Sequence, residues 1–264
     1  MCEFLYLNLL SCLSVVLSLK RAEIQSITFY EGRYEMKLKK YYFSVIFIVI
    51  FILASGLSFA DEERHKKKMK FRVTITNLTR GQVFSPPIAI GHDGKFRLFT
   101  LGKEASDELA ALAEGGATEP LVELIDGRYP TVVFDAPILP GASASETVEM
   151  GRFRLITVAG MLVTTNDAFF AARDIWFLGR RNVTVEAVAY DAGSEINSED
   201  CQDIPGPPCG APPNDHPDIE AEGYVLVHAG IHGIVPEGED PRVIPAERDW
   251  NNPVAKIRIQ RIYY

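Results

Sequence analysis

Short runs of alternating apolar and polar residues recur along residues 71–262. The first run, residues 71–76, alternates strictly and stops at Asn77, as a half-buried strand does. Eight further runs are rich in apolar or β-branched residues and are bounded by Gly, Pro, Asn or Asp: residues 88–90, 96–101, 132–134, 146–149, 153–163, 183–190, 223–228 and 254–262. Nine short strands separated by turns predict an all-β fold, an antiparallel β-sandwich.

One segment has helical rather than strand character. Residues 104–114 are rich in Ala, carry acidic residues early, and are followed by Gly115 and Gly116, which predicts a short helix with its stop signal. A second helical turn is predicted at residues 119–124. These helices do not alternate with strands, so the pattern argues against a parallel βαβ sheet.

The most hydrophobic segment lies before these strands. Residues 41–60 carry no charge, follow the basic stretch 36–40, and end in Ser58-Phe59-Ala60, with small residues three apart. This order predicts a signal peptide at residues 36–60 with cleavage after Ala60. An uncleaved membrane anchor is the alternative, because about 20 apolar residues suffice to span a bilayer. Residues 1–35 do not fit a signal peptide, so we interpret them as a non-native upstream extension and Met36 as the start.

Charge sharpens the view of the remaining chain. The whole sequence has a formal net charge of −8, and setting residues 1–60 aside leaves 21 basic and 31 acidic residues, a net charge of −10. Such a domain disfavours nucleic acid and anionic lipid as partners. Contact with a membrane is then expected only through the N-terminal segment, if it is uncleaved. A linker is predicted at residues 61–70, and one domain at residues 71–264.

Cys201 and Cys209 are the only cysteines of that domain. They enclose a short loop rich in Pro and Gly, and in an oxidising compartment we expect them to form a disulfide. A metal or redox pair is the alternative, with a weaker signal. The surrounding residues, 193–222, hold six prolines and predict a long loop without regular structure. The predicted location is secreted, periplasmic or at the cell surface.

Acidic residues gather where two predicted strands end. Asp167 follows the strand 153–163, and Asp191 and Glu195 follow the strand 183–190. If these ends meet at one rim of a sandwich, three carboxylates converge there, and oxygen ligands from neighbouring loops suit calcium. The alternative is ordinary turn chemistry, in which Asp and Gly serve only to end strands.

Several motifs together resemble a known family. They are Thr76-Asn77-Leu78-Thr79, Ser85-Pro86-Pro87, Gly91-His92-Asp93-Gly94, and the segments 160–170, 189–195, 227–233 and 249–255. In this order they resemble the spondin N-terminal domain in its bacterial form, from about residue 71 to residue 262. The resemblance implies a C2-like antiparallel β-sandwich with one or two short inserted helices.

The resemblance also implies a calcium site. In that family one Asp of a turn and two acids of an Asp-Ala-Gly-Thr-Asp turn hold the ion, and these positions fall on Asp167, Asp191 and Glu195. Glu195 departs from the pattern because it replaces Asp and is one methylene longer. The implied function is an exported calcium-dependent binding or cell-adhesion module, not an enzyme, whose partner is a protein or polysaccharide outside the cytoplasm.

Other chemistry is less well supported. His228 and His232 form a His-x3-His pair, which invites zinc or a secreted hydrolase centred on them, but no Glu accompanies them as in a metalloprotease. No nucleophile elbow, Walker loop or dinucleotide fingerprint is present, although a Ser–His–Asp site scattered along the chain stays open. Four aromatic residues after the Asp167 turn are either core or an exposed anchor for a partner: Phe169, Phe170, Trp176 and Phe177.

Overall fold

The computed structural model describes residues 69–177, 182–212, 221–233, 244 and 246–263. The predicted extension at residues 1–35 and the predicted signal peptide at residues 36–60 lie outside the described residues, as does most of the linker 61–70. Among the residues described, no helix is long and apolar enough to cross a membrane.

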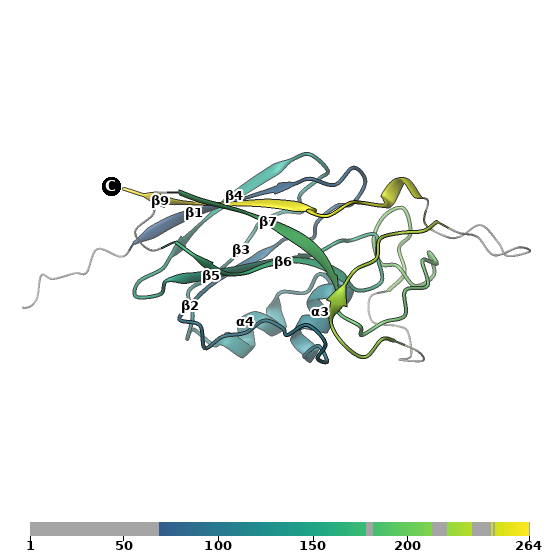
Figure 1. Cartoon of the computed structure of the whole chain (residues 1–264), viewed down its shortest axis with the longest axis horizontal. Helices are drawn as coiled ribbons and strands as arrows, with labels where there is room; N and C mark the ends of the chain where they lie inside the picture. The colour runs from purple at the N-terminus through teal and green to yellow at the C-terminus, as the bar shows by residue number, and fades with distance from the viewer. Residues whose placement is uncertain (1–68, 178–181, 213–220, 234–243, 245, 264) are drawn as a thin grey trace, which may run out of the picture. The chain divides into compact units, whose positions relative to one another are not determined.

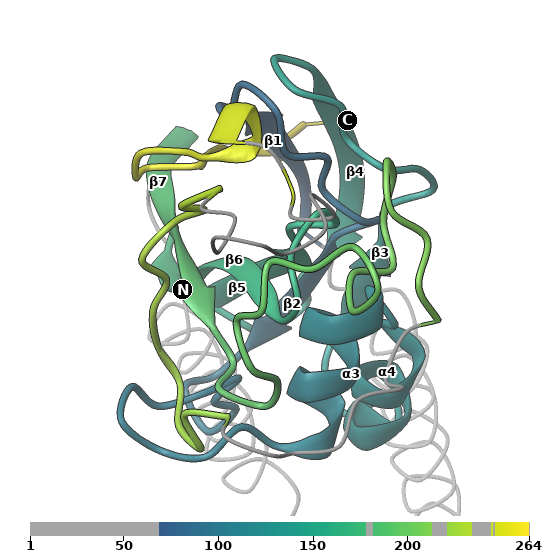
Figure 2. The same cartoon turned by 90° about the vertical axis from the view of Figure 1, so that its right-hand side faces the viewer.

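The described chain is mostly β, with one nine-stranded antiparallel sheet that is nearly closed into a barrel and two short helices (Figures 1 and 2). The strand order is β3-β2-β5-β6-β7-β9-β1-β4, and β8 pairs with β7 off this path. The strands are β1 Lys70–Asn77, β2 Ile88–His92, β3 Thr131–Val133, β4 Ser143–Glu149, β5 Leu155–Met161, β6 Ala168–Trp176, β7 Asn182–Asp191, β8 Leu226–Val227 and β9 Ala255–Ile262.

Strand β7 belongs to both halves of this sheet. Its C-terminal residues pair with β6, in the register Ala168↔Asp191 to Ala171↔Val188. Its N-terminal residues, from Asn182 to Ala187, pair with β9 instead. Because β7 crosses from one half to the other, the sheet folds over on itself, and β3 comes against β4 at the opposite seam.

The core has two parts that lie on opposite faces of β5 and β6. Phe170 packs inside the folded sheet, against Phe84 at a ring-centroid distance of 4.3 Å. Phe169, its neighbour, points to the other face, where it packs with Phe99 and the apolar residues of the helices. Successive side chains of a strand alternate between faces, so β6 is buried on both.

The two helices cover this second face. Helix α3 (Asp107–Gly115) begins at Ser106, whose hydroxyl accepts a hydrogen bond from the Leu109 amide, and ends at Gly116 with φ of +69°. Helix α4 (Glu119–Ile125) follows directly. Figure 2 shows both helices on the side of β2, β5 and β6. Both predicted helices are confirmed.

Two strand assignments from the sequence are wrong. Residues 96–101 form no strand, because Leu98 and Phe99 are both buried under the helices rather than paired in the sheet. The sequence pattern does not predict strand β6, because residues 168–172 form a continuous apolar run. Burial on both faces removes the alternation on which the prediction depends.

Candidate metal centre at the rim of the sheet

The turn before β6 and the end of β7 lie side by side at one rim of the sheet. Ala168 pairs with Asp191, and Asp167 directly precedes Ala168, so the two aspartates occupy neighbouring positions across the strand pair. The Ala192 amide donates to the Asp167 carbonyl at 3.2 Å. Thr165 shapes the turn, since its hydroxyl donates to the Leu162 carbonyl and accepts from the Ala168 amide. The strand register therefore brings Asp167 and Asp191 together.

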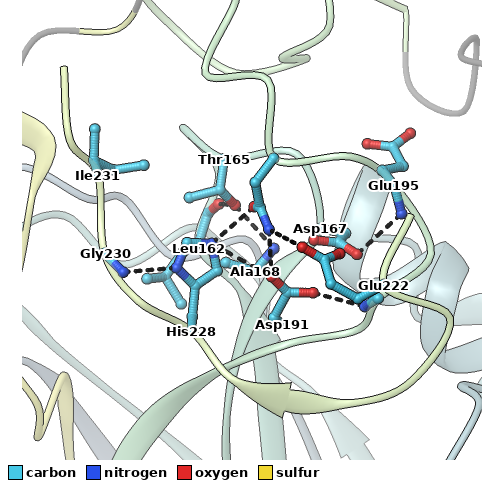
Figure 3. A network of polar contacts seen from close by, with 12 residues as sticks. Leu162, Thr165, Asp167, Ala168, Asp191, Glu195, Glu222, His228, Gly230 and Ile231 are labelled. Carbon is cyan, nitrogen blue, oxygen red and sulfur yellow. Dashed lines mark hydrogen bonds and ion pairs between the residues drawn. The ribbon is translucent and has the colours of Figure 1, made fainter. Parts of the chain in front are cut away.

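Asp167 is fully buried, and its two carboxylate oxygens differ in their hydrogen bonds (Figure 3). Its Oδ2 accepts hydrogen bonds from the Ser194 amide at 2.8 Å, the Ser194 hydroxyl at 3.3 Å and the Glu195 amide at 3.1 Å. Its Oδ1 is buried and has no hydrogen-bond donor within the described part of the chain. Buried acceptors almost always have a partner, so this atom needs a proton or a cation.

Asp191 is almost as deeply buried, and donors reach both of its oxygens. The Gly193 amide donates to Oδ1 at 2.7 Å, and the Asn197 side-chain amide donates to Oδ2 at 2.6 Å. Gly193 has φ of +68°, and a Cβ there would collide with the backbone of Tyr224. The turn thus requires glycine at this position.

Burial raises the pKa of both carboxyl groups. The pKa of Asp167 rises to about 7 because of burial and, next, the charge of Asp191, against the lowering effect of the two backbone amides. The pKa of Asp191 rises to about 6, again chiefly because of burial. A divalent cation would relieve both the burial cost and the repulsion.

Glu195 and Glu222 occupy different places around this pair. Glu195 offers its backbone amide to Asp167, but Figure 3 shows its carboxylate pointing away from the two aspartates. The charge of Glu222 raises the pKa of both Asp167 and Asp191, and its Oε1 accepts from the Asn197 amide at 3.2 Å. Sequence reasoning missed Glu222 because it lies beyond the Pro-rich loop, in a segment without periodicity.

The residues present fit a calcium ion only in part. Two buried carboxylates and the unpaired Oδ1 are hard oxygen ligands of the kind that calcium takes. In the part of the chain that the structure describes, however, no group of three or more His, Cys, Asp or Glu side chains is arranged to hold a metal ion. Binding would therefore need a third carboxylate, from Glu195 or Glu222, to turn toward the pair.

The loop after β7 covers this rim and contains the predicted disulfide. Cys201 and Cys209 are bonded, so this prediction is confirmed. Ile204, inside the bridged loop, is fully buried in the core, and the Thr164 hydroxyl donates to the Pro207 carbonyl at 3.0 Å. The described residues 193–212 contain no helix or strand. The bridge therefore fastens an irregular segment onto the turn that carries Asp167.

The two histidines of the His-x3-His pair have separate partners. His228 is buried, its Nε2 lies 3.1 Å from the Asn197 Oδ1, and burial lowers its pKa to about 4. His232 is exposed, and its Nδ1 lies 3.0 Å from Glu199 Oε1. Neither has a hydroxyl or thiol partner among the described residues. Both therefore serve to hold loops in place in this arrangement.

His92 does not join this site. It ends β2, opposite Leu155, whereas the Asp167 turn follows the other end of β5. Its Nε2 lies 2.9 Å from the Thr157 hydroxyl, and its Nδ1 accepts from the Gly94 amide. The fold thus keeps His92 and its neighbour Asp93 away from His228.

A comparison of the chain with protein-family models finds no match, and a comparison with curated proteins finds none either. The resemblance to the spondin N-terminal domain therefore stays a prediction that rests on the motifs given above.

Proposed function

We propose that this protein is an exported binding module that takes up calcium at the rim formed by Asp167 and Asp191. The observation that carries the proposal is the buried Asp167 Oδ1, which has no donor within the described residues and faces a second buried carboxylate. Two carboxylates so placed are costly when both are charged. A calcium ion supplies the missing positive charge, and the role proposed is binding rather than catalysis.

The third acidic ligand is proposed from the same electrostatics. The resemblance to the spondin family favours Glu195, whereas the influence of Glu222 on both aspartates favours Glu222. Asn197 donates to Asp191 and Glu222 together, so it holds these two carboxylates within reach of one another. The carboxylate of Glu222 thus needs the smaller rearrangement to join the pair.

The proposed setting is the cell envelope or the extracellular space. The signal-peptide pattern of residues 36–60 and the disulfide support an oxidising compartment. Extracellular modules bind calcium with dissociation constants of about 10⁻⁴ to 10⁻³ M. We propose a C2-like sandwich, in which the ion stiffens the rim loops that bind a protein or polysaccharide partner.

Thermal unfolding with and without calcium tests this proposal. The free energy of unfolding should rise with calcium concentration, by about 2.7 kcal/mol at a hundredfold excess over the dissociation constant. Asp167→Asn and Asp191→Asn should abolish the rise, and the matched control Asp135→Asn, on an exposed loop, should keep it. If millimolar calcium leaves the wild-type melting curve where EDTA does, the site does not bind calcium.

A matched pair of variants identifies the third ligand. Glu222→Gln should reduce the calcium-dependent rise more than Glu195→Gln, because the charge of Glu222 acts on both aspartates. The reverse order would assign the position to Glu195, as the resemblance implies. Both substitutions keep side-chain size, so melting in EDTA should change little.

A further inference from the structure

The β6–β7 hairpin is closed at one end and open at the other. The two strands pair only between Ala168–Ala171 and Val188–Asp191. Toward the hairpin turn, β6 stays with β5 while β7 turns away to pair with β9. Figure 1 shows the two strands diverging in this direction.

A cavity of about 540 Å³ lies along the diverging strands and reaches the paired ladder at Ala171, Val188 and Tyr190. Its lining includes every residue of β6 from Ala171 to Trp176, and Val183, Val185, Glu186, Val188 and Tyr190 of β7. Consecutive residues of a strand point to opposite faces of the sheet. A lining of consecutive residues therefore means that the cavity runs along the strand edges. We call this cavity the slot.

Backbone groups on the two slot-facing edges have no strand partner in the described part of the chain. The other edge of β6 pairs with β5, in the register Ile156↔Ile175 and Leu155↔Trp176. The other edge of β7 pairs with β9 from Asn182 to Ala187. Exposed strand edges are templates for the pairing of a further strand.

The side chains around the slot suit a ligand of a particular character. Trp176 is 53% exposed, although β6 pairs with β5 at this residue. Asp174 and Glu186 are exposed acids with no hydrogen bond to their carboxylates among the described residues, although His92 lies 3.7 Å from Asp174. Lys256 is opposite Glu186 in the register, without an ion pair between them. Among the described residues that line the slot, the charged side chains that lack a hydrogen-bond partner are thus acidic.

Arg173, the remaining charged residue of the slot, is already engaged. Its guanidinium stacks over the Phe99 ring at 4.1 Å and donates to the Phe99 carbonyl at 2.7 Å. It therefore does not offset the two acids for an incoming ligand. A basic side chain is the complement that the slot lacks.

We propose that the slot binds an extended peptide segment of a partner protein, which adds as a strand between β6 and β7. Its backbone pairs with the open edges, an apolar side chain contacts Trp176, and a Lys or Arg side chain lies near Asp174 and Glu186. Recognition by strand addition takes affinity from the backbone and specificity from alternate side chains. This inference is independent of calcium, because the open edges of the slot, residues 172–176 and 182–187, lie at the end of the two strands away from Asp167 and Asp191.

The probe is a capped six-residue peptide that alternates valine and lysine. It should quench or shift the fluorescence of Trp176, with Trp176→Phe as the control for the signal of buried Trp250. It should also slow hydrogen exchange at backbone amides of residues 172–176 and 183–187. Both effects should appear equally in EDTA and in calcium, which separates this test from that of the metal site.

Three comparisons make the test decisive. A peptide of the same sequence with alternate N-methylated amides should not bind, because it cannot pair with a strand edge. A peptide with glutamate for lysine should bind more weakly, and Glu186→Gln and Asp174→Asn should each weaken the lysine peptide roughly two- to fivefold. Asn keeps the positive φ of Asp174 accessible.

Some results would overturn the proposal. These are equal binding of the N-methylated peptide, absence of exchange protection at the slot edges, or protection by an acidic polysaccharide but not by the peptide. A circular dichroism melt of each variant shows whether it is folded. Because Asp174 and Glu186 are exposed, the two isosteric variants should melt as the wild type does.

Discussion

The closed and open halves of the β6–β7 hairpin contrast within a single pair of strands. In the closed half, the ladder from Ala168 to Ala171 is buried on both faces and ends at the acidic rim. In the open half, the strands part around a 540 Å³ slot, and Trp176 is exposed. The closed half fixes side chains at set distances, whereas the open half leaves backbone groups available. The cause of both is that β7 takes β6 as partner at one end and β9 at the other.

Register explains why the closed half can hold two carboxylates that repel one another. Pairing of Ala168 with Asp191 fixes the relative positions of the two chains, and a slip of one residue would exchange the faces of every side chain. The packing of Phe169 and Phe170 on opposite faces forbids such a slip. The stability of the core thus maintains an electrostatic arrangement that is unfavourable when both carboxylates are charged and no cation is bound.

The largest expected effect comes from the difference in packing between the closed and open halves of the hairpin. Phe170→Ala should lower the free energy of unfolding by about 3 to 5 kcal/mol, because it empties a fully buried site in the closed half. Trp176→Ala in the open half should lower it by at most about 1 kcal/mol, since the ring is half exposed. Urea denaturation of both variants measures the difference. Similar losses would mean that the open half is packed as tightly as the closed half.

A second prediction concerns the bridged loop, which contacts the turn before β6 at Thr164. Replacing Cys201 and Cys209 by Ala should lower the free energy of unfolding by about 2.5 kcal/mol, the chain-entropy estimate for a loop of this length. Calcium-dependent stabilisation should weaken as well, because Asn197 lies four residues before the bridged loop, in the same irregular segment. Peptide binding at the slot should persist below the melting temperature of the variant, and its loss in the folded protein would show that the two halves are coupled.

The smallest expected effect is a dependence on pH confined to the closed half. A carboxyl whose pKa is raised in the folded state stabilises the protein below its unfolded pKa, near 4, and loses this contribution as pH rises through about 7. In EDTA, Asp167→Asn should therefore become more stable than wild type as pH rises across this window, by about 1 to 2 kcal/mol.

Subtracting the free energies of unfolding of the two proteins at each pH separates the effect of Asp167 from that of His228. The lowered pKa of His228 acts with the opposite sign, since its contribution is present above 6.5 and is lost as pH falls through about 4. This contribution is present in both proteins and largely cancels in the difference. A difference that stays constant from pH 4 to pH 8 would contradict the raised pKa of Asp167.

The sequence predicts the elements whose signals are local. Strict alternation identifies β1, Ala-rich composition with a Gly stop identifies α3, and the short Pro-rich spacing identifies the Cys201–Cys209 disulfide. Strand β6 escaped detection because helices cover the face that would otherwise be polar. Residues 96–101 resemble a strand because four of the six are apolar, but Leu98 and Phe99 pack under those helices instead.

Some residues of the candidate site can likewise be predicted from the sequence, and others cannot. Asp167 and Asp191 are detectable because each follows a strand, and strand ends meet at a rim. Glu222 is not, because its position depends on the path of a long irregular loop. The slot is also beyond the sequence, since it arises from a change of partner along β7 and not from any residue pattern.

The position of β1 has a consequence for how the domain is made. This first strand lies between β4 and β9, and its register with β9 joins Lys70 to Ile262 and Asn77 to Ala255. The sheet therefore cannot be completed until β9 has left the ribosome. Contacts of such large sequence separation form slowly. A growing chain therefore remains without the pairing of β1 with β9 through most of its synthesis, and β4 can reach its place beside β1 before β9 exists.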